Sequence, residues 1–481
     1  MEDFTEQTAQ FLAWFKALPG ATFSDAISLV DLRQQEAGRG IVAVKDIEPD
    51  TVLFTIPRKS IINVETSTLR ELLPTLFEEA EMSSDEEEEE DDHEDSDEEM
   101  GSGDEDEDEE PRFDSWSSLI LILIYEHLSP SSAWKPYLDV LPTSFNTPMF
   151  WDAAELQHLQ ASATVGKIGK AQAERMFSKL IIPAVRANPK VFAGAEKYSD
   201  DDLIALAHRM GSTIMAYAFD LENEDNEDDE EDGWVEDRDG KALMGMVPMA
   251  DMMNADAEFN AHVHHGDDTL TVTSLRTIRA GEQILNYYGP HPNSELLRRY
   301  GYVSDCHARH DVVEVSWFFI EQAASSVLGL HMEALEKLHE ALEEEEELED
   351  TFVIERNIDL TPEGLFDEDS ATATATIPED LNEQLKFLLK TVKKQNPALI
   401  EDKRKRDEVH KQILRLTVQA LASQYPTSAA EDQRLLNQGV QGRERLGVIV
   451  RLGEKKILEE VAASLEDGDD APESSPKKAR V

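Results

Sequence analysis

The chain has 481 residues, of which 40% are hydrophobic, and its 102 acidic and 45 basic residues give a formal net charge of −57. The length predicts two or three domains of about 150 residues each. A surface this negative repels phosphate, so we expect no direct nucleic-acid partner, whereas a basic protein fits because opposite charges speed encounter.

Cysteine usage and hydropathy narrow the class of protein further. The one cysteine, Cys306, leaves no disulfide within the chain and no multi-cysteine zinc site, and it fits a reducing compartment. No run of 18 apolar residues occurs and the N-terminus lacks a signal-peptide pattern, so we expect no membrane span and no membrane partner. The basic end at 476–481 is typical of a nuclear import signal or of a flexible charged tail. We therefore expect the protein to reside in the nucleus, with the cytoplasm as a second location.

Much of the acidity lies in three blocks. Residues 85–110 contain 20 Asp and Glu and no Lys or Arg, residues 220–232 contain 10, and residues 343–350 contain 7. Such segments bury too little apolar surface to fold alone, so they are interpreted as solvated loops and one acidic helix. They could also attract a basic partner, and the two interpretations are compatible.

Periodicity predicts the secondary structure in chain order. Apolar residues recur at helical spacing in some stretches, and β-branched residues gather in others. Residues 113–219 and those from 317 onward are expected to be mostly helical. The individual predictions are a helix at 4–18, strands at 41–44 and 52–56, a helix at 116–127, strands at 269–275 and 284–288, and helices at 380–394, 401–422 and 442–465.

The order of these elements predicts an α+β fold. Two strand-rich pieces lie about 180 residues apart with helices between them, which indicates one β-rich domain interrupted by a helical insert. An all-α domain is expected to follow. Periodicity alone leaves open whether the two strand-rich pieces join.

Three short motifs carry the candidate chemistry. Gly38-Arg39-Gly40 lets the backbone approach a ligand closely, although a plain tight turn would have the same pattern. Asn254, within an apolar run, could offer donors and an acceptor to an amino-acid moiety or an adenine edge, or could instead cap the chain locally. The adjacent Tyr287 and Tyr288 could present hydroxyls to a pocket or pack in the core.

Together these motifs resemble the signature of the SET domain: Gly-Arg-Gly before the first strands, Asp-x-x-Asn at 251–254, and Gly-Glu-Gln-Ile…Tyr-Gly at 281–289. The finer similarity is to the Rubisco large-subunit methyltransferase type, whose SET domain is split by a helical insert. Residues 249–257 look most like the fungal ribosomal-protein lysine methyltransferases. Further stretches that support the resemblance lie at 53–58, 134–142, 215–219, 293–303 and 450–458.

The resemblance implies an enzyme that transfers a methyl group from S-adenosylmethionine to a lysine of a protein. It also implies a division of the chain into an N-terminal helix with the first part of the SET domain (1–79), an acidic disordered loop (80–112), a helical insert with the second acidic loop (113–240), the second part of the SET domain (241–305), a helical substrate-binding domain (306–462) and a flexible tail (463–481).

Roles at matching positions follow from the same resemblance. The family usually has His where Ala255 stands, which leaves a backbone contact there. Adjacent strand residues face opposite ways, and Tyr288 is preferred over Tyr287 because it precedes Gly289. The implied cofactor-binding residues are Gly38, Arg39, Gly40, Tyr217, Asn254, Ala255 and Tyr300; Trp116, Ala218 and Tyr288 would contact the substrate, and Tyr288 would be catalytic.

The predicted substrate is a basic protein, with a large-subunit ribosomal protein expected first and another nuclear or histone-like protein as the alternative. Two functions of other classes stay open: a catalytically dead SET domain that only binds lysine, which Ala255 alone favours, and an acidic chaperone for basic proteins. No metal is expected, because His262, His264 and His265 lie in a strand-like segment with alternating faces and no cysteine nearby.

Overall fold

A computed structural model describes residues 2–35, 37–77, 112–221, 243–343, 348–356 and 374–467. The predicted acidic loop at 80–112, apart from Arg112, lies outside the described residues. So do most of the second acidic block and the tail beyond Asp467. Within the described ranges, no helix is both long and apolar enough to cross a membrane.

The chain forms two compact units. The first combines Met1–Phe145 with Gly169–Gly289, and the second combines Asn146–Ile168 with Pro290–Val481. The first unit thus ends at Gly289, whereas the predicted border between the SET domain and the helical domain lies at residue 305.

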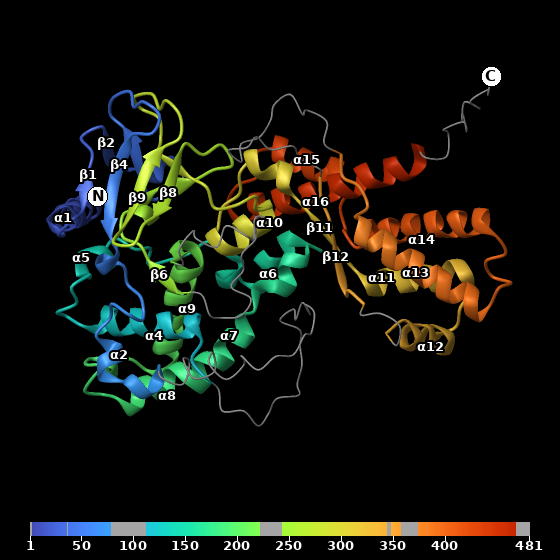
Figure 1. Cartoon of the computed structure of the whole chain (residues 1–481), viewed down its shortest axis with the longest axis horizontal. Coiled ribbons are helices and arrows are strands. Elements are labelled where there is room, and N and C mark those ends of the chain that lie inside the picture. Colours follow the sequence, from blue (N-terminus) through green and yellow to red (C-terminus); the bar gives the residue numbers. More distant parts are fainter. Residues whose placement is uncertain are drawn as a thin grey trace, which may run out of the picture. The chain divides into compact units, whose positions relative to one another are not determined.

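The strands of the first unit form a four-stranded sheet and three two-stranded pairs (Figure 1). They are β1 (Thr22–Phe23), β2 (Ile27–Asp31), β3 (Arg39–Ala43), β4 (Val52–Pro57), β5 (Ala218–Asp220), β6 (Met244–Met246), β7 (Asn254–Ala255), β8 (Ala261–His265), β9 (Thr269–Ser274) and β10 (Leu285–Asn286). The sheet has the order β1-β4-β9-β8 with antiparallel neighbours; β2–β3 and β5–β6 are antiparallel and β7–β10 is parallel.

The two strand-rich pieces of the sequence join in this sheet. β4 pairs with β9, so that Phe54 lies opposite Val272 and Ile56 opposite Leu270, and all four side chains are buried. Alternation along both strands places these apolar side chains on one face. The predicted interruption of one β-rich domain by a helical insert is therefore confirmed.

The helices of the first unit are α1 (Glu2–Ala17), α2 (Leu69–Leu72), α4 (Ser115–Leu128), α5 (Lys135–Leu138), α7 (Lys170–Met176), α8 (Ile182–Ala187) and α9 (Asp200–Tyr217). Asp114 caps α4 and Ser199 caps α9, each through a capping box. A Cβ at Gly211 of α9 would lie 3.0 Å from the Trp116 ring of α4, so a small residue there permits close packing. Because α9 ends at Tyr217 and β5 begins at Ala218, the helix positions both predicted site residues.

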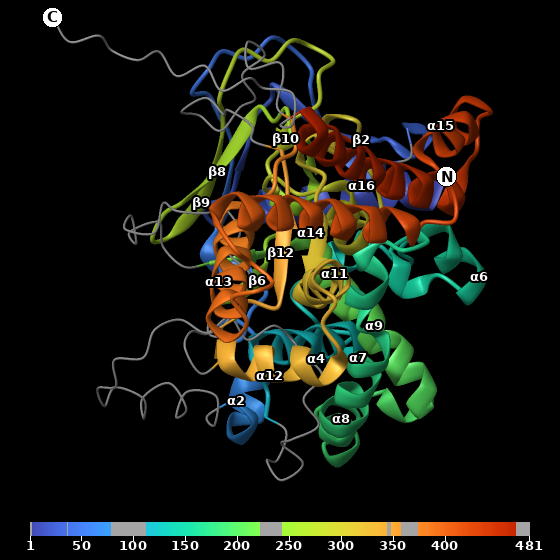
Figure 2. The same ribbon diagram turned by 90° about the vertical axis from the view of Figure 1, so that its right-hand side faces the viewer.

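The second unit is helical, as expected, and also contains an antiparallel ribbon that the all-α prediction omitted. β11 (Val313–Ser316) pairs with β12 (Thr351–Ile354), and four residues are too few for a clear period-2 signal. In Figure 2, α14 lies beside α11 and α13. The helices are α6 (Ala153–Leu156), α10 (Asn293–Glu295), α11 (Trp317–Leu328), α12 (Met332–Glu343), α13 (Glu379–Gln395), α14 (Lys403–Ser423), α15 (Ala429–Asn437) and α16 (Gly442–Asp467).

A small hydrophobic cluster explains why residues 146–168 and 290–305 belong to the second unit. Trp151 and Leu159 pack with Leu297, and all three pack with Leu446 and Val450 of α16. Burial of these side chains stabilises the unit by about 25 cal/mol for each Å² of apolar area. The segment 146–168 is therefore part of the core of the C-terminal unit.

Candidate active site

The Gly-Arg-Gly motif and Asn254 meet in the first unit although more than 200 residues separate them. Gly40 lies in β3, opposite Val30 of β2. A Cβ at Gly40 would lie 2.3 Å from Leu32 Cδ1 and 3.0 Å from Asn254 Nδ2. A larger residue here would have to push the Leu32 side chain aside, and the absence of a side chain lets the Gly40 backbone lie close to the Asn254 amide.

A short polar network holds Asn254 in place. β7 pairs in parallel with β10, so that Asn254 lies opposite Leu285. The Asn254 Nδ2 donates to Gln283 Oε1 at 2.9 Å. Asn260 fixes the same segment, because its Nδ2 donates to the Gln283 carbonyl at 2.8 Å and its Oδ1 accepts from the Leu285 amide at 2.9 Å. Gln283 and Asn260 were not predicted as site residues. Gln283 belongs to the motif at 281–289, but no role was assigned to it.

Ala255 follows Asn254 in β7 and lies opposite the buried Asn286 of β10. Its methyl side chain has no hydrogen-bonding group. A polar ligand at this position would therefore be held by the backbone, as the resemblance implies.

The two adjacent tyrosines differ in their contacts. The Tyr287 ring stacks on Phe259, with ring centroids 4.5 Å apart. The Tyr288 hydroxyl donates to the Met253 carbonyl at 3.3 Å. This carbonyl immediately precedes Asn254, so the Tyr288 hydroxyl lies at the Asn254 segment, whereas Tyr287 contributes to packing.

The Arg39 side chain has a structural role. Its Nε donates to Thr8 Oγ1 at 2.9 Å, one of its terminal nitrogens donates to the Val140 carbonyl at 2.7 Å, and the guanidinium lies over the Phe4 ring. It thereby ties α1 to the motif. The implied contact of Arg39 with a ligand, which runs through the backbone, stays a prediction.

The remaining predicted residues lie on other elements. Trp116 stacks on Phe177 within the helical insert, and Ala218 pairs with Met246 across β5–β6. Burial raises the pKa of Tyr217 to about 12. Tyr300 belongs to the second unit, where burial likewise raises its pKa to about 12.

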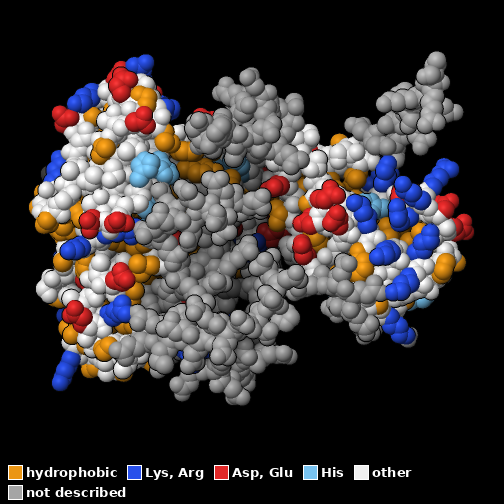
Figure 3. All heavy atoms as spheres, viewed as in Figure 1, with side chains coloured by type: hydrophobic (Ala, Val, Ile, Leu, Met, Phe, Trp, Pro, Cys, Tyr) orange, Lys and Arg blue, Asp and Glu red, His pale blue; other side chains and the backbone are white. Residues whose placement is uncertain are grey.

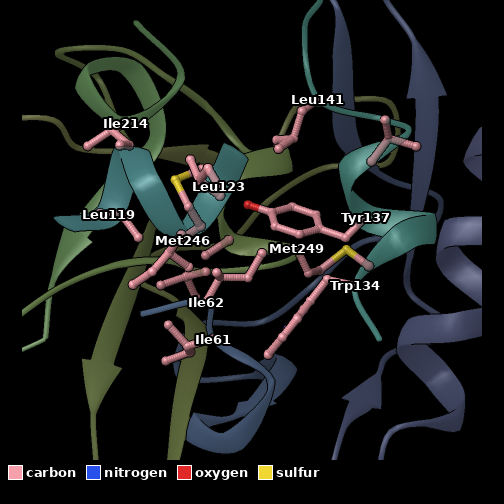
Figure 4. Close-up of a cluster of buried hydrophobic side chains, with 14 of the residues drawn as sticks. Ile61, Ile62, Leu119, Leu123, Trp134, Tyr137, Leu141, Ile214, Met246 and Met249 are labelled. Carbon is pink, nitrogen blue, oxygen red and sulfur yellow. The ribbon is translucent and has the colours of Figure 1, made fainter. Parts of the chain in front are cut away.

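A buried acid and phenol pair lies beside these residues and was not predicted. The Tyr137 hydroxyl donates to Asp251 Oδ2 at 2.5 Å, and both side chains are buried. Figure 4 shows Tyr137 among apolar side chains that include Leu141 and Met249. Asp251 Oδ1 has no hydrogen-bond partner among the described residues. Met249, two residues earlier, has a φ of 82°, a costly conformation for a residue other than glycine.

Asp251 makes the stability of the first unit depend on pH. Burial raises the pKa of its carboxyl group to about 7, from an ordinary value of 3.8. Between these values the native state keeps a proton that the unfolded chain has lost, so the free energy of unfolding falls as pH rises. Asp251→Asn removes this titration. We therefore expect its free energy of unfolding to rise by about 2–3 kcal/mol relative to that of wild type as the pH goes from 5 to 8.

Urea unfolding of both proteins at the two pH values measures this difference. The asparagine carbonyl can still accept from Tyr137, so the variant retains that contact. Parallel pH profiles of the two proteins would contradict the titration of Asp251.

The described residues show no evident metal site. Among the residues that the structure describes, no group of three or more His, Cys, Asp or Glu could hold a metal ion. His262 and His264 lie on the exposed face of β8 with ring centroids 4.6 Å apart, and His264 Nε2 is 2.8 Å from Thr273 Oγ1.

Comparison with family models identifies both units. A model described as the SET domain matches residues 38–289, and one described as the Rubisco LSMT substrate-binding domain matches residues 348–458. The first match contains the whole Gly40, Asn254 and Tyr288 group.

Curated relatives and solved structures agree with these matches. Ribosomal lysine N-methyltransferase 4 of Saccharomyces cerevisiae is 32% identical over 76% of this chain and 71% of that protein. N-lysine methyltransferase SETD6 of Bos taurus is 25% identical over 95% of both chains. The crystal structure of the SET domain of LSMT bound to lysine and AdoHcy is similar in fold, with a TM-score of 0.62 at 18% identity over 97% of this chain and 92% of that chain. The chain therefore belongs to the SET-domain family of protein lysine methyltransferases, with a substrate-binding domain of the Rubisco LSMT type.

Proposed function

We propose that this enzyme transfers a methyl group from S-adenosylmethionine to a lysine of a large-subunit ribosomal protein, with the Gly40, Asn254 and Tyr288 group as its centre. The observation that carries the proposal is the approach of the Gly40 backbone to the Asn254 amide beside the Tyr288 hydroxyl. Another nuclear or histone-like basic protein is the alternative substrate.

The residues of this group fit the cofactor. The Gly40 backbone lies close to the Asn254 amide, so a small polar ligand held by that amide would also reach the backbone of the Gly-Arg-Gly motif. The amide of Asn254 and the backbone of Ala255 suit the amino and carboxylate groups of a methionine moiety. Gly38, Arg39 and Tyr217 would complete the part of the binding site that lies in the first unit. Bound there, S-adenosylmethionine supplies a methyl group carried on a positively charged sulfur.

The tyrosines would prepare the lysine for reaction. A free lysine has a pKa of about 10.4, so its amine must lose a proton to water before it can attack. An apolar channel lined by tyrosines disfavours the charged form. Tyr217, whose pKa burial raises to about 12, stays a neutral hydrogen-bonding group at physiological pH. The Tyr288 hydroxyl, together with the Met253 carbonyl, would orient the amine, and fixed orientation replaces an improbable collision.

The choice of a ribosomal substrate is supported by two observations. The relative from Saccharomyces cerevisiae is named as a ribosomal lysine N-methyltransferase, and so is one from Schizosaccharomyces pombe that is 25% identical over 64% of this chain. The net charge of −57 favours encounter with basic proteins, to which ribosomal proteins commonly belong. Nuclear residence stays a prediction, because the basic tail lies outside the described residues.

Methyl transfer from radiolabelled S-adenosylmethionine into a ribosome-rich extract tests the proposed function. We expect a labelled band of ribosomal-protein size with wild type and none with Tyr288→Phe. Label only in a histone fraction would favour the alternative substrate. No label in any fraction, with no cofactor binding, would favour the lysine-binding module.

Asn254→Ala tests the cofactor site separately. We expect the dissociation constant of S-adenosylmethionine to rise about tenfold, because a lost polar contact costs about 1 kcal/mol or more. Isothermal titration measures it. Asn437→Ala, at an exposed position in α15, should leave the constant unchanged. Equal constants for Asn254→Ala and wild type would refute the assignment of Asn254.

A further inference from the structure

The basic residues of this acidic chain are concentrated on two helices of the second unit. Residues 386–415 contain ten of the 45 Lys and Arg but only four Asp and Glu. Figure 3 shows Lys and Arg side chains gathered over the region where Figure 1 labels α13 and α14. We define the basic face as Lys386, Lys390 and Lys393 of α13 with Lys403, Arg404 and Arg406 of α14.

The spacing of the lysines along α13 builds one half of this face. Lys386, Lys390 and Lys393 follow one another at steps of four and three residues, so they share one side of the helix. Leu385 and Leu388 are buried on the other side. The three ammonium groups are therefore exposed along about 10 Å of the helix axis.

The first turn of α14 builds the other half. Lys403, Arg404, Lys405 and Arg406 follow the N-cap Asp402 directly. Cations in a first turn oppose the helix dipole, so helix stability does not explain them. Burial lowers the pKa of His410, and the charges of Lys386 and Arg406 lower it further while that of Asp407 raises it, so cations of both helices lie near one imidazole.

Much of this positive charge is not neutralised within the unit. Lys386 pairs with Glu379 at 3.8 Å and Arg406 with Asp407 at 3.3 Å, and all four side chains are exposed. Such surface pairs contribute about 0–1 kcal/mol and leave the charges accessible. Lys390, Lys393, Lys403 and Arg404 have no carboxylate partner in the described part of the chain.

We propose that the basic face binds the phosphate backbone of RNA. The inference rests on the proposed ribosomal substrate: a basic protein would be repelled by this face, whereas the RNA that surrounds such a protein is complementary to it. The aromatic residue of α13, Phe387, is buried, so phosphate contact without base stacking is expected.

This proposal revises the expectation of no nucleic-acid partner. That expectation summed charge over the whole chain, but at physiological salt exposed charges act over about 8 Å. A local face can therefore bind phosphate although the acidic blocks give the chain a net charge of −57.

Fluorescence anisotropy of labelled single-stranded oligouridine of about 20 nucleotides, with the full chain, tests the basic face. We expect binding at about 50 mM salt that weakens steeply towards about 200 mM. The triple variant Lys390→Glu, Lys393→Glu, Arg404→Glu should bind at least about tenfold more weakly. The matched control Lys179→Glu, Lys190→Glu, Lys197→Glu changes the net charge equally at exposed positions of the helical insert, and should bind like wild type.

Three results would overturn the proposal: no binding by wild type at low salt, equal loss in both triple variants, or equally tight binding of a polyglutamate peptide of the same charge. The last result would indicate an acidic protein as partner. Methylation of a free ribosomal protein should be the same in both triple variants. If wild type and both triple variants all fail to methylate this ribosomal protein, the proposed function is contradicted, but the RNA-binding result still stands.

Discussion

Tyr288→Phe is expected to lower the rate constant of methyl transfer by about 10² to 10³-fold, the effect of removing one well-placed polar group from an active site. Its hydroxyl lies 3.3 Å from the Met253 carbonyl, so both groups can orient one amine. Phenylalanine keeps the ring and its packing. The dissociation constant of S-adenosylmethionine should therefore stay nearly unchanged, and single-turnover transfer of a labelled methyl group measures the loss.

Tyr287→Phe is the matched control, because it removes the same atom from the neighbouring residue. The Tyr287 ring stacks on Phe259, and phenylalanine preserves this contact. We expect the control to retain most of the activity. Full activity of Tyr288→Phe with loss in Tyr287→Phe would transfer the catalytic role to Tyr287.

The sequence was most informative where the elements are long or strongly patterned. The helix predicted at 380–394 is α13 (Glu379–Gln395), and the strands predicted at 52–56 and 269–275 are β4 and β9. Periodicity did not show that these two strands, more than 200 residues apart, pair with each other. The antiparallel pairing of β4 with β9 in the structure shows it. Strands of two to four residues, such as β7 and β11, are too short for a period to be recognised.

The candidate site was predictable in its motifs but not in its contacts. Gly40 and Asn254 were chosen because their motifs resemble those of a family, and the close approach of the two residues could be seen only in the fold. The bond between Tyr137 and Asp251 joins residues 114 positions apart, and no local pattern distinguishes a buried aspartate from an exposed one. The role of each predicted residue stays a prediction.

Buried charge in the second unit was likewise invisible to periodicity. Asp432 of α15 accepts from Arg451 at 2.7 Å and from the Lys455 ammonium of α16, and all three side chains are at most 6% exposed. Arg451 also donates to the His158 carbonyl. Burial would raise the pKa of Asp432, but the hydrogen bonds with Arg451 and Lys455 outweigh it and lower that pKa. The carboxylate is therefore charged at physiological pH and compensates two buried cations.

Asp432→Asn is expected to destabilise the second unit by about 3–5 kcal/mol, because it leaves the Arg451 and Lys455 charges buried without their partner. The side-chain volume is retained, so lost packing does not contribute. Urea unfolding measures the loss, and amide hydrogen exchange should show faster exchange in α15 and α16. Asp407→Asn removes a carboxylate from an exposed pair with Arg406 and should cost less than about 1 kcal/mol. Equal small losses in both variants would mean that water reaches Asp432 and screens its charge.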